Sequence, residues 1–339
     1  MKNLALVVLI IASLFGCEPN PGESIKDELN KKEVPVFLHD VTGPVKPWTK
    51  DTFELSEEDF TFAIISDLTG GERAGVYSSA VKQLNRLDPT FVTSVGDLIE
   101  GGTEDLSQLK AEWDSFDDRT LKLNMPFFHV GGNHDLTNPV MAKYWQERFG
   151  PLYYHFVYEN VLFLMIDSED YGEARMLEVN TARNIAMKVI RGEIAGKFSD
   201  TEYAKMQESM VGGISPEQQA YFKDVLAKYP EVRWTFLFMH KPVWKRTDSL
   251  GLGELETVLA NRPYTLFNGH EHSFSYRERN GRDYTILGTT GGWQDSKDSM
   301  AFDHITLVRM AKEPVVTHLK MTGILDETGA LLEEAKLVK

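Results

Sequence analysis

The amino-acid sequence predicts an α/β fold in which strands are covered on both faces. From Phe60 onward, short apolar runs rich in β-branched and aromatic residues recur, and each stops abruptly at a polar cluster. Helical stretches such as 74–87 lie between these runs. Because near-continuous apolar runs are typical of strands buried on both faces, runs and helices together predict an α/β arrangement.

Five of the expected strands end directly before side chains that could bind a ligand. Each apolar run stops at its own polar cluster: 60–66 at Asp67, 90–95 at Gly96-Asp97, 126–130 at Gly131-Gly132-Asn133-His134-Asp135, 234–239 at His240, and 264–267 at Asn268-Gly269-His270-Glu271-His272. In open α/β sheets, ligands bind beyond the carboxyl ends of the strands. We therefore expect these five polar clusters to converge.

Other elements have their own signals. Ser215 is a predicted N-cap, with Pro216 at the first helical position and Gln218 completing a capping box. The segments 303–310 and 315–320 are expected to be further strands that complete a sheet. Residues 169–212 are predicted to form a helical insertion, with apolar residues at helical spacing at Ala182, Ile185, Ala186, Val189 and Ile190. The insertion could be a lid or bulk, and we favour bulk because such a stripe is usually buried.

Length and composition exclude several classes of protein. The chain has 339 residues, of which 42% are hydrophobic and 26% charged, as in ordinary folded proteins of one or two domains. The formal charge of −15 and the lack of a Lys/Arg run argue against a nucleic-acid scaffold or an anionic lipid surface as partner. Cys17 is the single cysteine, so no intramolecular disulfide can form. A metal site must therefore use oxygen and imidazole ligands unless Cys17 joins it.

The N-terminus has the pattern of a secretion signal. Lys2 precedes an apolar stretch, 4–15, that is shorter than the about 20 residues needed to span a bilayer. It ends in Leu14-Phe15-Gly16-Cys17, which resembles the lipobox of bacterial lipoproteins and implies cleavage before Cys17 and acylation of its sulfur. A plain secretory signal with an incidental cysteine is the alternative. Glu18 after the cysteine favours a lipid anchor in the outer membrane of the bacterial cell envelope, facing the periplasm or the outside.

The expected organisation has four parts. Residues 1–16 are the signal peptide, and 17–58, rich in proline and glycine without sustained periodicity, are a tether and an extended arm. Residues 59–311 form the main domain. Residues 312–339 are C-terminal strands and a tail packed on that domain.

The ordered polar clusters resemble the calcineurin-like metallophosphoesterase family over about residues 60–310. The resemblance implies an αββα sandwich with a metal site at the strand carboxyl ends. It also implies an enzyme that hydrolyses phosphomonoester, phosphodiester or pyrophosphate bonds of a small molecule by attack of a metal hydroxide. By resemblance, Asp97 bridges two metal ions, Asp67 and His272 bind the first, and Asn133, His240 and His270 bind the second. His134 is the implied general acid, with Asp135 orienting it and a neighbouring carboxylate keeping the imidazole charged.

The donor types favour particular cations. Carboxylate, amide and imidazole ligands suit divalent or trivalent Mn, Fe or Zn, and the absence of thiolates argues against a structural zinc site. The glycines among the clusters would let the backbone turn sharply and approach an ion closely.

One motif departs from the family. Its usual Asp-x-His is here Asp67-Leu68-Thr69, so one histidine ligand of the first metal is missing, and we expect that metal to bind more weakly unless Glu72 or Glu100 replaces it. Arg73 could contact a phosphate oxygen or be a solvated arginine. A noncatalytic or mono-metal ligand-binding surface lipoprotein with a decayed first site is therefore the alternative function.

The remaining candidates have ordinary interpretations. The histidines outside the motifs are expected to be structural, although His304 could approach the site: His129, His155, His304 and His318. His270 and His272, two apart, would share a face of a strand, with Glu271 pointing away into solvent. Trp293 is expected to pack in the core or line a pocket. The sequence leaves the substrate and the oligomeric state open.

Overall fold

The computed structural model describes residues 37–53 and 59–321. The predicted signal peptide, Cys17, most of the tether and the end of the tail lie outside the described residues. Within the described part, no helix is both long enough and apolar enough to cross a membrane.

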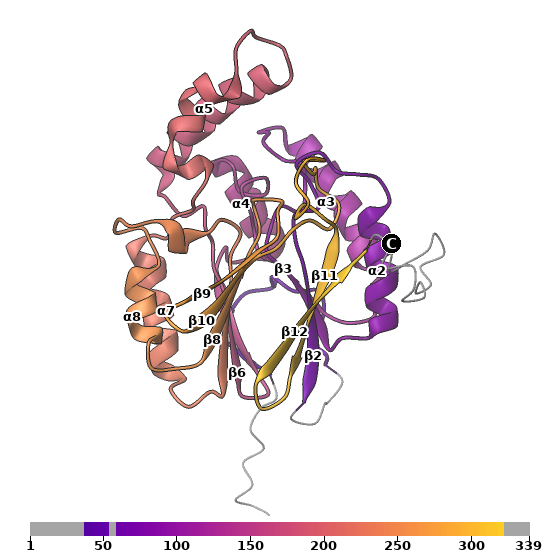
Figure 1. The fold of residues 1–339 in the computed structure, drawn as a ribbon, viewed down its shortest axis with the longest axis vertical. Coiled ribbons are helices and arrows are strands. Elements are labelled where there is room, and N and C mark those ends of the chain that lie inside the picture. Colours follow the sequence, from indigo (N-terminus) through magenta and orange to yellow (C-terminus); the bar gives the residue numbers. More distant parts are fainter. Residues whose placement is uncertain (1–36, 54–58, 322–339) are drawn as a thin grey trace, which may run out of the picture. The chain divides into compact units, whose positions relative to one another are not determined.

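The described strands form two sheets (Figure 1). The seven-stranded sheet has the order β1 (Phe37–His39), β5 (Tyr154–Tyr158), β6 (Val161–Met165), β7 (Trp234–Phe238), β8 (Tyr264–Asn268), β10 (Arg282–Ile286), β9 (Ser275–Arg279). The five-stranded sheet has the order β12 (Pro314–Lys320), β11 (His304–Met310), β2 (Phe60–Ile65), β3 (Phe91–Ser94), β4 (Phe127–Phe128). The strands β2, β3 and β4 are mutually parallel, as are β6, β7, β8 and β10.

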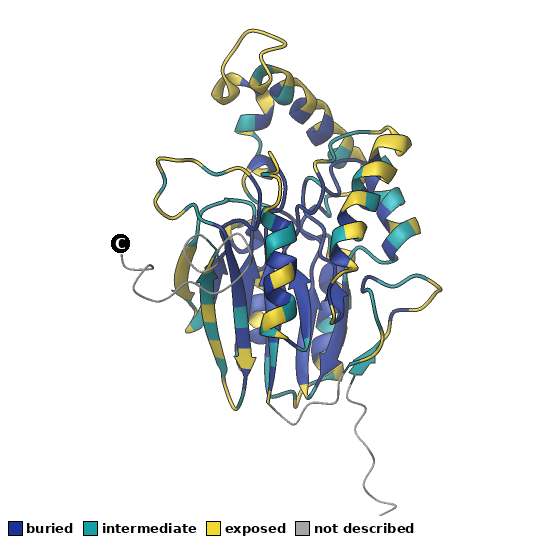
Figure 2. Ribbon diagram, turned by 90° about the vertical axis from the view of Figure 1, so that its right-hand side faces the viewer, coloured by how far each residue is buried: buried dark blue, intermediate teal, exposed yellow. Residues whose placement is uncertain are grey.

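Aromatic side chains fill the space between the two sheets. Phe62 and Phe91 of the five-stranded sheet stack with centroids 5.2 Å apart, and Phe62 meets Phe163 of the seven-stranded sheet edge-on at 5.4 Å. Phe163 in turn stacks on Phe156 at 4.6 Å. Most of the strands contribute to this shared core and are buried (dark blue in Figure 2), whereas the edge strands β9 and β12 are half-buried or exposed.

Helices cover the outer face of each sheet. The apolar faces of α2 (Val76–Leu87), α3 (Leu106–Thr120) and α4 (Pro139–Phe149) pack on the five-stranded sheet, and those of α7 (Pro216–Lys228) and α8 (Gly253–Leu259) pack on the seven-stranded sheet. This arrangement confirms the predicted αββα sandwich.

The predicted elements lie where the sequence placed them. The runs expected as strands correspond to β2, β3, β4, β7, β8, β11 and β12, and the stretch 74–87 corresponds to α2. The flanking β1 pairs antiparallel with β5, so the arm before residue 59 adds an edge strand to the sheet. The sequence analysis did not identify β5, β6, β9 and β10.

The capping box of α7 is only half formed. The Ser215 hydroxyl accepts a hydrogen bond from the backbone N–H of Gln218 at 3.1 Å, as predicted. The side chain of Gln218, however, is not directed back to Ser215 N, which donates to Asp170 Oδ2 instead. Gln218 bonds both backbone groups of Asp167, because it is buried against the loop that follows β6.

The segment 169–212 contains α5 (Glu173–Ile190), α6 (Glu202–Lys205) and the 3₁₀ turns η1 (Phe198–Asp200) and η2 (Gln207–Ser209). Ala182 and Ala186 are buried in a small cluster with Tyr203 of α6. The prediction that the whole apolar stripe is buried is wrong, because Ile185 and Ile190 are 51% and 57% exposed. In Figure 1, α5 stands beyond the ends of the strands.

Candidate metal centre

Loops that follow β2, β3, β4, β7 and β8 bring the candidate ligands together. Nε2 of His272 lies 3.2 Å from Asp67 Oδ1, and Nε2 of His240 lies 3.1 Å from Asp97 Oδ2. One donor atom from each of Asp67, Asp97 and His272 falls within 4.8 Å of the others. These three residues are the ligands that the resemblance implies for the first metal.

The residues implied for the second metal also gather near Asp97. His240 Nε2 is 3.1 Å from Asn133 Oδ1 as well as from Asp97, and the rings of His240 and His270 are 5.2 Å apart. Asp97 therefore lies close to both groups of candidate ligands, as a bridging carboxylate must.

A backbone carbonyl fixes the orientation of each histidine in the site. Since a carbonyl can only accept, the ring nitrogen that meets it carries the hydrogen, and the opposite nitrogen of the neutral ring is an acceptor. The four bonds are His134 Nδ1 to Glu100 O at 2.7 Å, His240 Nδ1 to Val95 O at 2.9 Å, His270 Nε2 to Ser209 O at 3.0 Å and His272 Nδ1 to Trp293 O at 2.5 Å. Such outer hydrogen bonds are what orients imidazoles for metal binding.

Glycines allow the close packing of the ligand loops. An alanine Cβ at Gly132 would lie 2.3 Å from Asp97 Oδ1, and one at Gly269 would lie 2.3 Å from Asp67 Oδ2. A Cβ at Gly70 would meet the rings of His272 and His134 at 3.2 and 3.5 Å. These close approaches agree with the role expected for the motif glycines.

Four candidate ligands have left-handed backbone conformations. The φ angles are 45° for Asp67, 57° for Asp97, 75° for His270 and 54° for His272. Such conformations cost about 1–3 kcal/mol each and persist where the surroundings enforce them, often at functional sites. They also correct the prediction that His270 and His272 share a strand face, because both lie in the turn after β8.

Glu271 of this turn is not simply solvated as expected. Its carboxylate forms an ion pair with Lys245, which lies in the loop after β7.

The electrostatics of the buried site favour a cation. Burial alone would raise the pKa of Asp97, but the charges of His240 and His134 hold that pKa well below its ordinary range. Burial opposes charge on His240 and His272 too, yet Asp97 and Asp67 respectively raise the pKa of each imidazole to about 9. The carboxylates thus attract protons that a metal ion can replace.

The donor set fits the cations that the sequence favours. Asp67 and Asp97 are almost fully buried, and buried carboxylates are costly unless a positive charge compensates them. Oxygen and oriented imidazole nitrogen are the donors that Mn, Fe and Zn accept.

Asp135 does not orient His134, contrary to the prediction. Its buried carboxylate accepts hydrogen bonds from the backbone N–H groups of Leu98 at 2.9 Å, Ile99 at 3.1 Å and Gly132 at 2.8 Å. Asp135 therefore ties the Asp97 loop to the loop after β4, and the Glu100 carbonyl orients His134 instead.

His134 is also not held charged by its neighbours in this structure. Burial lowers the pKa of His134; Asp97 opposes this effect, and the charge of Arg183 adds to it.

The residues proposed to fill the place of the missing histidine are engaged elsewhere. The Thr69 hydroxyl donates to Ile99 O at 2.7 Å and to Asp97 O at 3.2 Å. Glu72 forms an ion pair with Arg119, and Glu100 Oε1 accepts from the backbone N–H groups of Gly71 and Glu72. Both carboxylates are thus engaged by other protein groups.

Arg73 contacts protein groups and is partly exposed. Its guanidinium pairs with Asp303 at 2.6 Å and donates to Gly292 O at 2.9 Å. It thereby helps to hold the loop that presents Trp293 O to His272. The Trp293 side chain is 58% exposed, so the prediction that it packs in the core is wrong.

The other histidines pack among aromatic rings. His129 stacks on Phe149 at 4.4 Å and bonds Pro47 O, and His155 Nδ1 bonds the Tyr221 hydroxyl at 2.7 Å. His304 and His318 contact each other and Phe274, with ring centroids 4.6–6.0 Å apart. Burial lowers the pKa of each of these four histidines to about 4, in agreement with structural roles.

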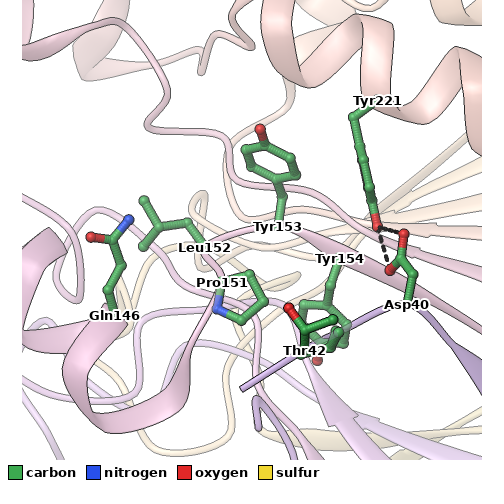
Figure 3. A pocket seen from close by; sticks show the side chains of 9 residues that line it. Asp40, Thr42, Gln146, Pro151, Leu152, Tyr153, Tyr154 and Tyr221 are labelled. Atoms are coloured by element: carbon green, nitrogen blue, oxygen red, sulfur yellow. Dashed lines mark hydrogen bonds between the residues drawn. The ribbon is translucent and has the colours of Figure 1, made fainter. Parts of the chain in front are cut away.

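A separate hollow lies beside the arm that contains β1. Figure 3 shows this hollow of about 420 Å³, in which the Tyr221 hydroxyl donates to Asp40 Oδ1 at 3.0 Å. None of the candidate metal ligands lines it; its residues are Asp40, Val41, Thr42, Gln146, Pro151, Leu152, Tyr153, Tyr154 and Tyr221.

A four-layer αββα fold with carboxylates and oriented imidazoles gathered at its strand ends defines the class of metal-dependent phosphoesterases. The model of the calcineurin-like phosphoesterase family matches residues 60–274, and the chain belongs to this family.

Solved structures with low sequence identity are similar to this chain, and one of them, with a TM-score above 0.5, shares its fold. The structure of PhoD is 10% identical, with a TM-score of 0.51 over 77% of this chain and 68% of that one. A dimetal phosphatase from Danio rerio is 15% identical, with a TM-score of 0.48 over 77% and 99% of the two chains. A purple acid phosphatase from yellow lupin is 11% identical, with a TM-score of 0.49 over 78% and 52%. No curated protein matches the sequence.

Proposed function

We propose that this protein hydrolyses phosphomonoester, phosphodiester or pyrophosphate bonds at a pair of metal ions, with His134 as the general acid. The observation that carries the proposal is the set of four imidazoles, each held by a backbone carbonyl through one ring nitrogen, so that the other nitrogen becomes an acceptor once it has lost its proton, together with the buried Asp67 and Asp97. A structural cluster does not require every histidine to be oriented in this way.

Each residue has a defined part in this proposal. Asp67 and His272 would hold the first cation, Asn133, His240 and His270 would hold the second, and Asp97 would contribute to both sites. When bound, two cations of Mn, Fe or Zn would supply positive charge that activates a water for attack at phosphorus and neutralises phosphate oxygens.

His134 gives its proton from Nε2. The bond from Nδ1 to Glu100 O holds the ring, and Gly70 leaves space beside Nε2. The negative charge of a phosphate ester next to the imidazole favours its protonated form, which opposes the effect of burial. The proton then passes to the oxygen that leaves phosphorus.

We also propose that the first cation binds more weakly than the second. This proposal is supported by the engagement of the Thr69 hydroxyl and of the Glu72 and Glu100 carboxylates in other bonds. The same observation favours the second candidate function, a mono-metal ligand-binding protein without turnover.

The test combines metal titration with turnover. Purified protein is loaded with Mn, Fe or Zn and assayed with phenyl phosphate, p-nitrophenyl phosphate and bis(p-nitrophenyl) phosphate. Asp97→Asn retains an acceptor oxygen for the His134 N–H, which bonds Asp97 Oδ1 at 2.8 Å, but we expect it to lose metal and turnover. Turnover at two bound equivalents supports the enzyme, whereas one equivalent and no turnover with any metal would favour the mono-metal binding protein.

The general acid has its own test. His134→Gln should retain the metal and lose about 10²–10⁴-fold in kcat for phenyl phosphate, whose leaving group needs a proton. The loss should be much smaller for p-nitrophenyl phosphate, because that leaving group departs as a stable anion. His318→Gln, on the edge strand β12, is the matched control. Equal losses for both substrates would contradict proton donation by His134.

We further propose the organisation and location expected from the sequence. Residues 1–16 are removed, Cys17 carries the lipid anchor at the outer membrane, 17–58 are the tether and arm, 59–311 are the catalytic domain with the insertion 169–212, and 312–339 pack on that domain. Membrane contact is through the lipid only. Fractionation of cells that express the full chain should show the protein in membranes and Cys17→Ser released from them; an unchanged distribution would contradict the anchor.

A further inference from the structure

The insertion helix α5 has two polar residues on its buried face. Asn180 and Arg183 are three positions apart, so they lie on the same side of the helix, and they are 5% and 6% exposed. Val179, Ala182 and Ala186 of the same face pack in the small cluster with Tyr203. The buried face of α5 is therefore part apolar contact and part polar surface.

The polar part has no protein partner to explain it. Among the residues that the structure describes, none forms a hydrogen bond or an ion pair with the Arg183 guanidinium, and the buried Asn180 Oδ1 accepts no hydrogen bond. Asn180 Nδ2 reaches Glu104 Oε1 only at 3.5 Å. The Arg183 nitrogens are not among the fully enclosed polar atoms that lack a partner, so the guanidinium reaches solvent at the end of an otherwise buried side chain.

Other arginines of the same region are paired. Arg175 contacts Glu208 at 2.8 Å, Arg191 contacts Glu193 at 2.5 Å, and Arg246 contacts Asp248 at 2.7 Å. The acidic residues needed to pair Arg183 are thus common in this part of the chain, yet none lies within ion-pairing distance of it.

The Arg183 guanidinium lies against the loop that supports His134. An alanine Cβ at Gly102 would be 2.5 Å from Arg183 Nη1, so the absence of a side chain there leaves space for the guanidinium. The preceding Gly101 packs on the carbonyl of His134, where a Cβ would come within 1.8 Å of the oxygen. Glu100, which directly precedes Gly101, holds the His134 ring through its backbone carbonyl.

We propose that Arg183 binds a second phosphoryl group of the substrate, on the leaving-group side, so that the preferred substrates are phosphoanhydrides such as nucleoside diphosphates. This inference rests on the proposed function, because His134 marks the leaving-group side only if it is the proton donor. A planar guanidinium with five N–H donors is suited to phosphate oxygens. Asn180 Oδ1 beside it offers an acceptor for a hydroxyl of the same leaving group.

The course of the hydrolysis explains why the positively charged Arg183 guanidinium is useful beside the leaving group. A water oxygen forms a bond to the terminal phosphorus and the bridging P–O bond breaks, while the water's own proton passes to solvent. The bridging oxygen leaves on the second phosphoryl group and takes the proton of His134. Arg183 neutralises the charge of that departing group, which grows as the bond breaks.

The kinetic test compares ADP, which has a second phosphoryl group, with p-nitrophenyl phosphate, which has none, on the Mn-loaded protein. For Arg183→Gln we expect kcat/KM for ADP to fall about 10- to 100-fold, as for loss of a hydrogen bond to a charged group. The value for p-nitrophenyl phosphate should change less than about threefold. Gly102→Ala, which displaces the guanidinium, should also lower the ADP preference, whereas Arg191→Gln on the exposed end of α5 should leave it unchanged.

Two measurements without turnover accompany the kinetics. Calorimetry on the metal-free protein should show tighter binding of inorganic pyrophosphate than of inorganic phosphate, and Arg183→Gln should remove that difference. The melting temperature of Arg183→Gln should stay close to that of the unsubstituted protein, because the guanidinium forms no hydrogen bond or ion pair with the described residues that the substitution would remove.

The outcomes separate this inference from the proposed function. Hydrolysis of p-nitrophenyl phosphate together with an ADP preference that is absent, or unaffected by Arg183→Gln, would overturn the role of Arg183 and leave the phosphoesterase standing. Absence of all turnover together with pyrophosphate binding that depends on Arg183 would overturn the phosphoesterase and retain the anion site. Equal losses for both substrates with a lowered melting temperature would make Arg183 structural and overturn the inference.

Discussion

Gly132→Ala should strongly lower the metal affinity of the protein while lowering its stability only moderately. An alanine Cβ at this position would lie 2.3 Å from Asp97 Oδ1 and 2.6 Å from Asp97 N, against at least 3.4 Å in an ordinary contact. The Asp97 loop must therefore move by about 1 Å to relieve the clash. Metal–ligand distances in proteins tolerate a change of only about 0.2 Å, so a displaced Asp97 should bind metal poorly. We expect metal affinity to fall by at least about 10- to 100-fold.

The cost in stability should be moderate. Overpacking of a well-packed site costs about 1–3 kcal/mol, which corresponds to a fall of roughly 2–6 °C in melting temperature for a domain of this size. Gly253→Ala is the matched control, since a Cβ there meets no atom within 4 Å and the residue is the first of α8. It should change neither metal binding nor stability measurably.

The assay is a calorimetric titration of Mn²⁺ into chelator-treated protein, with a thermal melt of each variant. If Gly132→Ala takes up two equivalents with the affinity of the unsubstituted protein, the inference that Asp97 binds metal from its observed position is refuted. A loss of affinity in Gly253→Ala as well would mean that the titration reports general stability.

Three further predictions concern other parts of the chain. Burial lowers the pKa of His129 to about 4 in the folded protein, against about 6.5 in the unfolded chain, so the free energy of unfolding should fall by about 3 kcal/mol as the pH falls from 6.5 to 4. Urea unfolding of His129→Phe should depend correspondingly less on pH, and an equal pH dependence of the two proteins would contradict this. Thr69→Val removes the hydrogen bonds to Asp97 O and Ile99 O and should destabilise the protein by about 1–2 kcal/mol without changing metal affinity. Thr69→His should instead increase the affinity for the more weakly bound metal. An increase with valine, or none with histidine, would contradict the proposal that the first metal lacks a histidine ligand at position 69. Ser215→Ala should cost about 1 kcal/mol in urea unfolding through loss of the α7 cap, and no change would show that Pro216 and tertiary packing suffice.

The parts predictable from sequence are those in which a local pattern carries the information. Each of the ligand-bearing strands has its own apolar run and its own polar stop, so the positions of Asp67, Asp97 and His240 at strand ends followed from the chain alone. The motif glycines, such as Gly132 and Gly269, predicted close approaches of the backbone to the candidate ligands, because only a residue without a side chain fits there. The exposure of Ile185 and Ile190 was not predictable, since helical spacing does not say whether a second surface covers the stripe.

The parts that could not be predicted depend on backbone groups of distant segments. The carbonyls that orient the histidines belong to Val95, Glu100, Ser209 and Trp293, and a carbonyl gives no signal in the residue type. Asp135 was assigned to the imidazole next to it in sequence, whereas its carboxylate accepts from N–H groups some 36 residues away. Arg183 was overlooked because an arginine in an amphipathic helix is ordinarily solvated, and only the fold buries it.

The ligand carboxylates and the ligand loops hold one another in place. The Asp67 carboxylate accepts the backbone N–H of His270 at 3.1 Å, and that of Asp97 accepts the backbone N–H of His134 at 2.8 Å. Each carboxylate thus fixes the loop that carries another candidate site residue, while Asp135 fixes the Asp97 loop. These bonds link the loops after β2, β3, β4 and β8 to one another through the same carboxylates that are the candidate ligands. A substitution at Asp67 or Asp97 should therefore disturb the position of a second candidate site residue as well as remove a ligand.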